Sequence, residues 1–237
     1  MRLAAAGHFS TAWNPRYMAD YREAKDRRRF YLDRGLRKRS RGAGSDLARL
    51  MELPRARVPM NFGDLFGEIP VMVVDGIATR AYAPERMTKD IDFLVEHEQF
   101  AFSVRRLGEQ GWVKRADLHF TTSTLGLYGQ EWERDEVIVD LISTDQDWGR
   151  EAFASPAVFD TTGLRVIPLA YLVLMKIDSA RGIDQGDLTR MLGRLSDGEV
   201  EAVVAVVDRH SHDAQAADDV RQYALLGRLE WDRDSSL

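Results

Sequence analysis

The chain has 237 residues, of which 44% are hydrophobic and 30% are charged, a composition typical of a globular protein. It contains no cysteine, so disulfide bonds and cysteine-ligated zinc are excluded, and we expect a cytoplasmic protein. No apolar run approaches the roughly 20 residues that span a membrane. The first residues, MRLAAAGHFSTAW, are too weakly apolar to predict a secretory signal.

Charge is distributed unevenly along the chain. Residues 1–41 hold 12 Lys and Arg against 4 Asp and Glu, a net charge of +8, whereas the remainder holds 21 against 34, a net charge of −13. Basic residues beside aromatic ones suit the phosphates and bases of RNA. The same composition is also typical of a solvated extension, and the stretch is compatible with a position upstream of the true start codon. We predict a basic extension over residues 1–43 and leave its role open.

Residues 71–95 predict a strand, a turn, a helix and a second strand. Val71–Val74 form a short apolar run, rich in β-branched residues, that is typical of a buried strand. Gly76 follows where the chain has to turn. Ile77–Tyr82 can then form a helix, and the free N–H groups at the start of a helix favour a phosphate.

The second strand carries two aspartates. Thr88–Val95 read TKDIDFLV, and residues two apart on a strand point to the same face, so Asp90 and Asp92 project together. Two carboxylates at this spacing repel each other unless a cation lies between them, and a divalent metal is the simplest such cation. A D-x-D pattern also occurs on solvated strand edges and turns. The apolar residues around this one favour the metal site.

A third carboxylate lies further along the chain. Glu98–Gln110 predict an amphipathic helix, and Leu118–Thr124 with Leu125–Trp132 predict a hairpin. Glu136–Ser143 then read as a buried strand that contains Asp140. A carboxylate inside such a strand is costly unless it is paired or binds a metal. The alternative is a position near the strand end, where backbone groups would satisfy Asp140.

The C-terminal part is predicted to be helical. A short strand over Leu164–Ile167 is followed by a helix over Leu169–Arg181, which carries Lys176 on or beside its apolar face and ends at Gly182. Two later helices are predicted over Glu199–His210 and Asp213–Leu229.

Two aspartates follow the Lys176 helix. Asp184 can cap the next helix and shares a side with Asp187, three positions on. The alternative interpretation is structural: Lys176 extends its charged end to water from an apolar face, Asp184 is only a cap, and Asp187 is a surface charge.

These features together predict a nucleotide site. Asp90, Asp92 and Asp140 fall on two predicted strands, and neighbouring strands would bring them within reach of shared metal ions. Two divalent ions held in this way can activate a hydroxyl and stabilise a leaving pyrophosphate. The turn at Gly76 lets the backbone approach a phosphate, and Lys176 supplies a positive charge for the β- or γ-phosphate.

The order of these motifs resembles that of the nucleotidyltransferase superfamily. The residues read VDGIAx3Yx3RxTxDIDFL, then VDLI, then Lx2LxLxKIx3Rx2Dx2DL, over about residues 70–195. More narrowly, the pattern is similar to the AbiEii-type group, the toxin half of type IV toxin–antitoxin pairs. The resemblance implies an α+β fold, a nucleotidyltransferase-like mixed β-sheet flanked by helices with a C-terminal helical region. We predict a core over residues 44–167 and the helical region over 168–237.

The resemblance also implies residue roles. Asp90 and Asp92 would bind the catalytic Mg²⁺ or Mn²⁺ ions, Asp140 would be the third carboxylate as base or metal partner, and Lys176 would hold the triphosphate. The other residues that it assigns to the nucleotide site are Gly76, Arg86, Thr88, Arg181, Asp184 and Asp187.

One position departs from the family pattern. The family has Gly-Gly or Gly-Ser where this chain has Asp75-Gly76. A carboxylate there would repel a triphosphate unless it points away or helps to bind metal.

Three functions are compatible with the sequence. The first is a metal-dependent transfer of a nucleoside monophosphate from a nucleoside triphosphate (NTP) to RNA or tRNA, by a toxin-like protein with a cognate antitoxin; small molecules and proteins are alternative acceptors. The second, favoured by Asp75, is a non-catalytic NTP- or RNA-binding regulatory module. The third, a metal-dependent phosphohydrolase, lacks support because the five histidines show no metal-site spacing beyond His210-x-His212. No membrane partner is expected.

Overall fold

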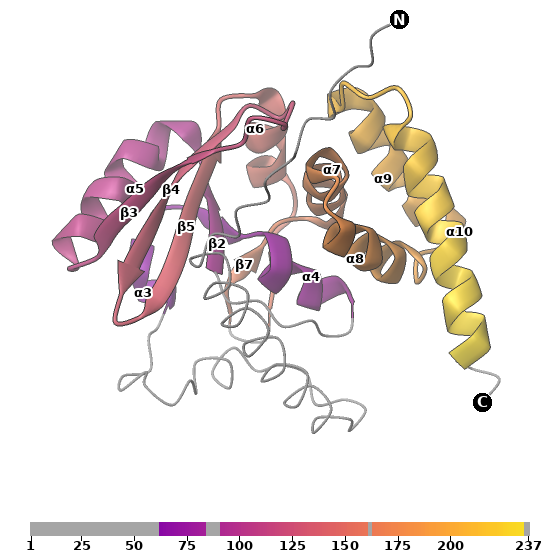
Figure 1. Cartoon of the computed structure of the whole chain (residues 1–237), viewed down its shortest axis with the longest axis horizontal. Helices are drawn as coiled ribbons and strands as arrows, with labels where there is room; N and C mark the ends of the chain where they lie inside the picture. The colour runs from indigo at the N-terminus through magenta and orange to yellow at the C-terminus, as the bar shows by residue number, and fades with distance from the viewer. Residues whose placement is uncertain (1–61, 84–90, 161–162, 235–237) are drawn as a thin grey trace, which may run out of the picture. The chain divides into compact units, whose positions relative to one another are not determined.

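A computed structural model describes residues 62–83, 91–160 and 163–234 of the chain (Figure 1). The strands are β1 (Val71–Val73), β2 (Ile91–Val95), β3 (Val113–His119), β4 (Leu127–Arg134), β5 (Val137–Thr144), β6 (Val158–Phe159) and β7 (Arg165–Val166). The helices are α3 (Phe62–Phe66), α4 (Asp75–Tyr82), α5 (His97–Glu109), α6 (Asp147–Ala154), α7 (Leu169–Ser179), α8 (Gly182–Leu192), α9 (Asp197–His210) and α10 (Ala216–Asp234).

The strands form one mixed sheet in the order β3-β4-β5-β2-β1-β7-β6. The pairs β2–β5 and β1–β7 are parallel, and the other neighbouring pairs are antiparallel. Strand β2 therefore lies in the middle of the sheet, and each of its residues is buried. The predicted α+β fold, a mixed sheet flanked by helices, is confirmed.

One face of the sheet packs against α3 and α5. Phe93 of β2 is fully buried there, with ring contacts to Phe62 and Phe66 of α3 at centroid distances of 6.0 and 5.0 Å. Leu107 of α5 belongs to the same core, as does Leu141 of β5. This face of the central strands is largely apolar, and the aspartates of β2 and β5 lie on the opposite face.

The opposite face packs against the C-terminal helices. Leu94 of β2 and Ile142 of β5 share a core with Leu172 of α7, Leu188 of α8 and Val207 of α9. Figure 1 shows α7 to α10, coloured brown to yellow, as a group of helices next to the strands. The predicted domain boundaries at 43/44 and 167/168 stay predictions.

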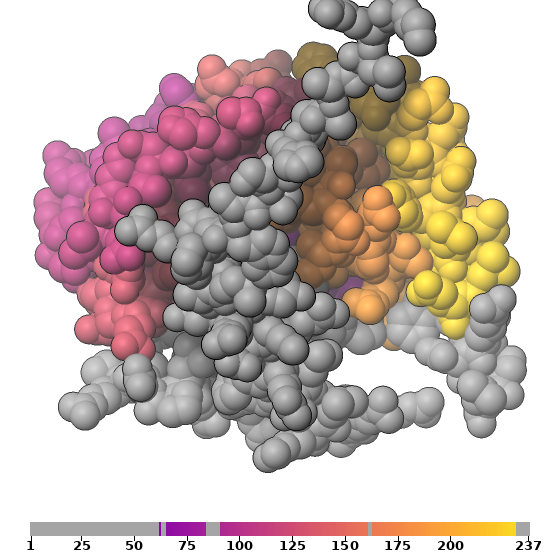
Figure 2. Space-filling view, in the orientation of Figure 1, coloured from indigo at the N-terminus to yellow at the C-terminus, as the bar shows by residue number. Residues whose placement is uncertain are grey.

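Helices α8 and α10 cross at two glycines. A Cβ atom on Gly193 would lie 2.5 Å from the carbonyl carbon of Gly227, and a Cβ atom on Gly227 would overlap the carbonyl oxygen of Thr189. Neither site has room for a side chain, so this crossing fixes how α10 lies on α8. In the space-filling view α10, in yellow, forms an outer surface of the described part (Figure 2).

Local interactions and backbone conformation explain where α9 begins and where α7 ends. Ser196 and Glu199 form a capping box at the start of α9, in which the Ser196 backbone N–H donates to Glu199 Oε2 at 2.8 Å. Helix α7 ends at Ser179, because Ala180 has a left-handed φ of 49°. The prediction that Gly182 ends this helix is wrong: Gly182 is the first residue of α8.

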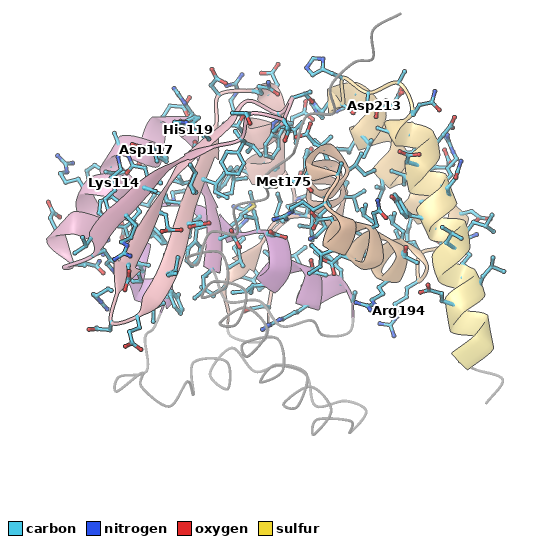
Figure 3. All side chains as sticks on the ribbon, viewed as in Figure 1. Lys114, Asp117, His119, Met175, Arg194 and Asp213 are labelled. Carbon is cyan, nitrogen blue, oxygen red and sulfur yellow. The ribbon has the colours of Figure 1, made fainter. Side chains whose placement is uncertain are left out.

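The predicted hairpin is present with different boundaries. Its strands run over Val113–His119 and Leu127–Arg134, rather than over Leu118–Thr124 and Leu125–Trp132. Strand β3 is one edge of the sheet, and its charged residues include Lys114 and Asp117 (Figure 3). Charged side chains on an edge strand disfavour pairing with another chain.

Helices of the described ranges are too short or too polar to cross a membrane.

Candidate active site

Two of the predicted aspartates lie side by side in the sheet. Strands β2 and β5 are parallel neighbours, and their register places Asp92 directly opposite Asp140. Side chains alternate along a strand, so both carboxylates share the sheet face of Leu94 and Ile142, which packs towards α7. Asp92 is 8% exposed and Asp140 is half-buried. Two carboxylates this close in a partly buried place favour a cation between them.

The turn after β1 is held beside this pair. The backbone N–H of Val74 donates to the carbonyl oxygen of Asp92 at 2.9 Å, and helix α4 begins at the next residue, Asp75. The hydroxyl of Thr79 donates to the carbonyl oxygen of Asp75 at 2.9 Å, which braces the first turn of α4. The β1–α4 turn is therefore a direct neighbour of the strand that carries Asp92.

A further carboxylate continues the row on the next strand. Strand β4 pairs with β5 so that Glu131 lies opposite Asp140, and Ala116 of β3 lies opposite Glu131. Exposure rises along this row, from buried Asp92 to exposed Ala116. The acidic row thus opens to solvent towards the β3 edge of the sheet.

The metal set predicted from the sequence is only partly described. Asp90 lies outside the described residues. Within residues 62–83, 91–160 and 163–234, no three His, Cys, Asp or Glu side chains are grouped so that they could hold a metal ion. Asp92 and Asp140 are the members of the predicted set whose relative position is known.

Lys176 lies at the centre of an ion network. Its Nζ donates to Asp75 Oδ1 at 2.9 Å, to Asp184 Oδ1 at 2.7 Å and to Asp187 Oδ2 at 2.8 Å. The Lys176 side chain is 2% exposed, and those of Asp184 and Asp187 are 1% exposed. An ammonium group has three N–H bonds, so carboxylates use all of them. Met175, labelled in Figure 3, marks this part of α7.

Arg181 extends the network to the surface. Its Nη2 donates to Asp75 Oδ2 at 2.7 Å, and its Nε donates to Asp184 Oδ2 at 2.6 Å. The hydroxyl of Ser179 adds a bond of 2.5 Å to the same oxygen of Asp184. Asp184, which was predicted as a cap, is therefore a buried ion partner of Lys176 and Arg181, and the cap position of α8 is Arg181.

The network shifts the pKa values of its members. Burial alone would raise the pKa of the Asp75 and Asp184 carboxyls, but Lys176 and Arg181 outweigh it and hold both below their usual range. Burial would lower the pKa of the Lys176 ammonium, yet the carboxylates around it raise that pKa instead. All three groups are therefore charged at neutral pH.

Asp75 has an unusual backbone conformation. Its φ is +47°, in the left-handed region that glycine adopts most easily. The sequence interpretation assigned the sharp turn to Gly76, and the structure corrects this by one position: Gly76 is the buried second residue of α4. A carboxylate-bearing residue thus occupies the strained position of the turn.

The structure brings most predicted site residues into two groups. Asp92 and Asp140 form the acidic pair, and Lys176, Arg181, Asp184 and Asp187 form the ion network. Two residues predicted to bind the nucleotide, Arg86 and Thr88, lie outside the described residues with Asp90. The roles assigned to all of these residues stay predictions.

Two features of the site were missed from the sequence. Glu131 lies opposite Asp140, but this pairing depends on the β4–β5 register, which no local sequence pattern gives. The bond between Asp75 and Lys176 joins residues 101 positions apart, and no sequence signal marked it.

Comparisons with known proteins find likenesses in structure alone. No family model matches the sequence, and no curated protein matches it. A protein of H. pylori proposed to be a nucleotidyltransferase shares 14% identity over 68% of this chain and 86% of its own, with a TM-score of 0.36. JHP933 from Helicobacter pylori shares 12% over 71% and 88%, with a TM-score of 0.36.

A third similar structure is that of ANT(2″)-Ia in complex with adenylyl-2″-tobramycin. It shares 14% identity over 69% of this chain and 89% of its own, with a TM-score of 0.38. At these identities and TM-scores, the likenesses do not assign the chain to a family.

Proposed function

We propose that the protein is a metal-dependent nucleotidyltransferase that moves a nucleoside monophosphate from an NTP to an acceptor. The observation that carries this proposal is the register of β2 and β5, which sets Asp92 opposite Asp140 on one sheet face. The order of motifs along the sequence agrees with it. The β1–α4 turn lies next to the same strand, as a phosphate-binding turn would have to do.

The acidic pair suits a hard divalent cation. Mg²⁺ prefers oxygen ligands and is commonly bound by one or two carboxylates together with substrate phosphates, so Asp92 and Asp140 are a fitting donor set. When bound, the ion would stabilise the negative charge that develops on the transferred phosphoryl group. Asp90 is proposed as a further ligand on the basis of the D-x-D pattern.

The carboxylates would also handle the proton of the acceptor. A carboxylate within hydrogen-bond reach of a hydroxyl can take its proton as that hydroxyl attacks. Asp140 lies between Asp92 and Glu131 and is more exposed than Asp92. We propose Asp140 as this base and Glu131 as a group that orients the acceptor.

RNA, including tRNA, is the acceptor that we propose. Residues 1–41 have a net charge of +8 from 12 basic and 4 acidic residues, which would attract a phosphate backbone. The acidic remainder of the chain would not attract it. The toxin-like role and a cognate antitoxin are proposed from the sequence resemblance alone.

A labelling experiment tests the proposal. The protein is incubated with Mg²⁺, one α-³²P-labelled NTP at a time, and total bacterial RNA, and then RNA, protein and small molecules are resolved. We expect label in a discrete RNA band. Asp92→Asn should abolish it, whereas Asp145→Asn, which changes an exposed aspartate just beyond β5, should not. Equal labelling by the wild type and Asp92→Asn would refute the assignment. Label in protein or a small molecule would keep the reaction and change the acceptor.

A non-catalytic NTP-binding module is a second candidate. The observation that favours it is the ion network, in which carboxylates use every N–H bond of Lys176. NTP binding that depends on Asp92, without label in any acceptor, would support this candidate over the enzyme.

A further inference from the structure

The carboxylate of Asp75 bridges two cations. One oxygen accepts from Lys176 Nζ at 2.9 Å and the other accepts from Arg181 Nη2 at 2.7 Å. A phosphate group offers oxygens of the same charge at a similar spacing, so it could bind the same two donors. Asp75 therefore occupies the positions on Lys176 and Arg181 that a phosphate of a bound nucleotide would need.

Asp75 is also the accessible carboxylate of the network. Its side chain is 22% exposed and that of Arg181 is 54% exposed, whereas Asp184 and Asp187 are 1% exposed. An anion arriving from solvent would meet Arg181 and Asp75 first. Asp184 and Asp187 would stay on Lys176 and keep its ammonium group in place.

The charge balance of the network favours exchange at this position. The five side chains carry three negative and two positive charges. If the Asp75 carboxylate moves away from Lys176 and Arg181, two carboxylates remain for the two cations. A triphosphate then meets the N–H bonds of Lys176 and Arg181 that Asp75 had occupied, with two carboxylates beside them rather than three.

The backbone of Asp75 shows that the carboxylate comes at a structural cost. Non-glycine residues rarely adopt a φ of +47°, and glycine would adopt it without strain. Such strain persists where surrounding contacts hold the residue, and the bonds to Lys176 and Arg181 are contacts of that kind.

We propose that Asp75 sets the affinity of this site for the triphosphate of a nucleotide, because its carboxylate holds Lys176 and Arg181 until a phosphate replaces it. The inference rests on the proposed function, since it takes the ligand to be an NTP. Replacing the carboxylate breaks two charge-assisted hydrogen bonds and forms equivalent bonds to phosphate oxygens. Binding is therefore weaker than it would be at the same site without Asp75.

Two substitutions test the inference. Asp75→Asn removes the charge, and asparagine tolerates the left-handed region; Asp75→Gly removes both the charge and the strain. Affinity for each NTP with Mg²⁺ is measured by calorimetry, with Asp145→Asn as control. We expect both variants to bind at least about tenfold more tightly, which corresponds to about 1.4 kcal/mol, and the control to match the wild type.

A coupled variant separates this role from a structural one. In an Arg181→Gln background, the same Asp75→Asn change should have less than half its effect on NTP affinity, because one of the two competing contacts is already gone. A change in folding stability alone would not produce this coupling.

Several outcomes would overturn the inference. If neither variant tightens NTP binding, or if only Asp75→Gly does, the carboxylate does not compete with phosphate. NTP binding that depends on Asp92 but is unaffected by Asp75 would leave the proposed function intact. If no variant binds any NTP, both the inference and the proposed function fail. Should Asp75→Asn fold poorly, Asp75→Gly is compared in the wild-type and Arg181→Gln backgrounds, because relief of backbone strain alone would change NTP affinity equally in both.

Discussion

Lys176→Met is expected to destabilise the fold strongly. Lys176 is buried between three carboxylates, and two of these, Asp184 and Asp187, are 1% exposed. Methionine has a similar length but no charge, so the substitution leaves these carboxylates without their shared cation. Arg181 still binds Asp184 in this variant.

The magnitude follows from the burial of the network. Removing one partner of a buried ion pair costs about 3–5 kcal/mol, because the buried carboxylates lose the cation that they share. With a urea slope of about 2 kcal/mol/M, this loss lowers the unfolding midpoint by about 2 M. Adding Asp187→Leu should recover part of the loss, because it removes a carboxylate that Lys176 no longer neutralises.

Urea unfolding followed by circular dichroism measures both variants. Lys114→Met is the matched control: Lys114 lies on the edge strand, is 40% exposed and pairs with Asp117 at the surface, so its loss should cost less than about 1 kcal/mol. If Lys176→Met also lost less than about 1 kcal/mol, the ion network would not be a buried structural unit.

Three further predictions concern packing, pH and the basic extension. Gly227→Ala should cost about 1–3 kcal/mol because the new methyl group overlaps the Thr189 carbonyl, whereas Gly198→Ala, with open space around it, should be neutral or stabilising in the same urea assay. The Asp75 and Asp184 carboxyls have lowered pKa values in the fold, so the unfolded chain binds more protons at acidic pH. The free energy of unfolding should therefore fall as pH drops below about 4, and a flat profile from pH 5 to 3 would contradict this. Removal of residues 1–41 should weaken RNA binding and flatten its salt dependence in a filter-binding titration, and an unchanged slope would assign this stretch to a solvated extension.

Local patterns predicted the central strands well. The β-branched run of β1 and the apolar run of β5 lie within one residue of their predicted ends, because buried strands in mid-sheet have strong hydrophobic signals. The alternation of β2 also placed Asp92 on the face opposite Phe93, as the two separate cores show. Predicting the face of Asp92 requires only the two-residue period of a strand, and the hydrophobic pattern of β2 shows that period.

The β3–β4 hairpin was harder to predict for physical reasons. Leu125 is fully buried although it lies in the loop, where its carbonyl oxygen accepts from Trp148 Nε1 at 3.0 Å and from Thr144 Oγ1 at 2.8 Å. In the sequence, an apolar loop residue that tertiary contacts bury cannot be told from a buried strand residue. The edge strand β3 is hard to predict for a different reason. Its register shifts between Lys114 and Ala116, and this breaks the alternation of side chains between the two faces.

The site could be predicted only as far as its local parts. The aspartates and Lys176 were identified, but which of them meet depends on strand register and on how α7 and α8 lie against the β1–α4 turn. The sequence indicated that Asp75 would repel a triphosphate. The ion pairs of Asp75 with Lys176 and Arg181 make this expectation specific: the carboxylate and a phosphate would compete for the same two donors.

Mn²⁺ binding tests the central claim, that Asp92 and Asp140 form one divalent-cation site. Electron paramagnetic resonance measures free Mn²⁺ in the presence of a non-hydrolysable triphosphate for the wild type, Asp92→Asn, Asp140→Asn and the double variant. Because both carboxylates would bind the same ion, each single change should weaken Mn²⁺ binding at least about tenfold, and the double change should add less than the product of the two effects. Unchanged affinity in either single variant, or fully independent effects in the double variant, would contradict the account.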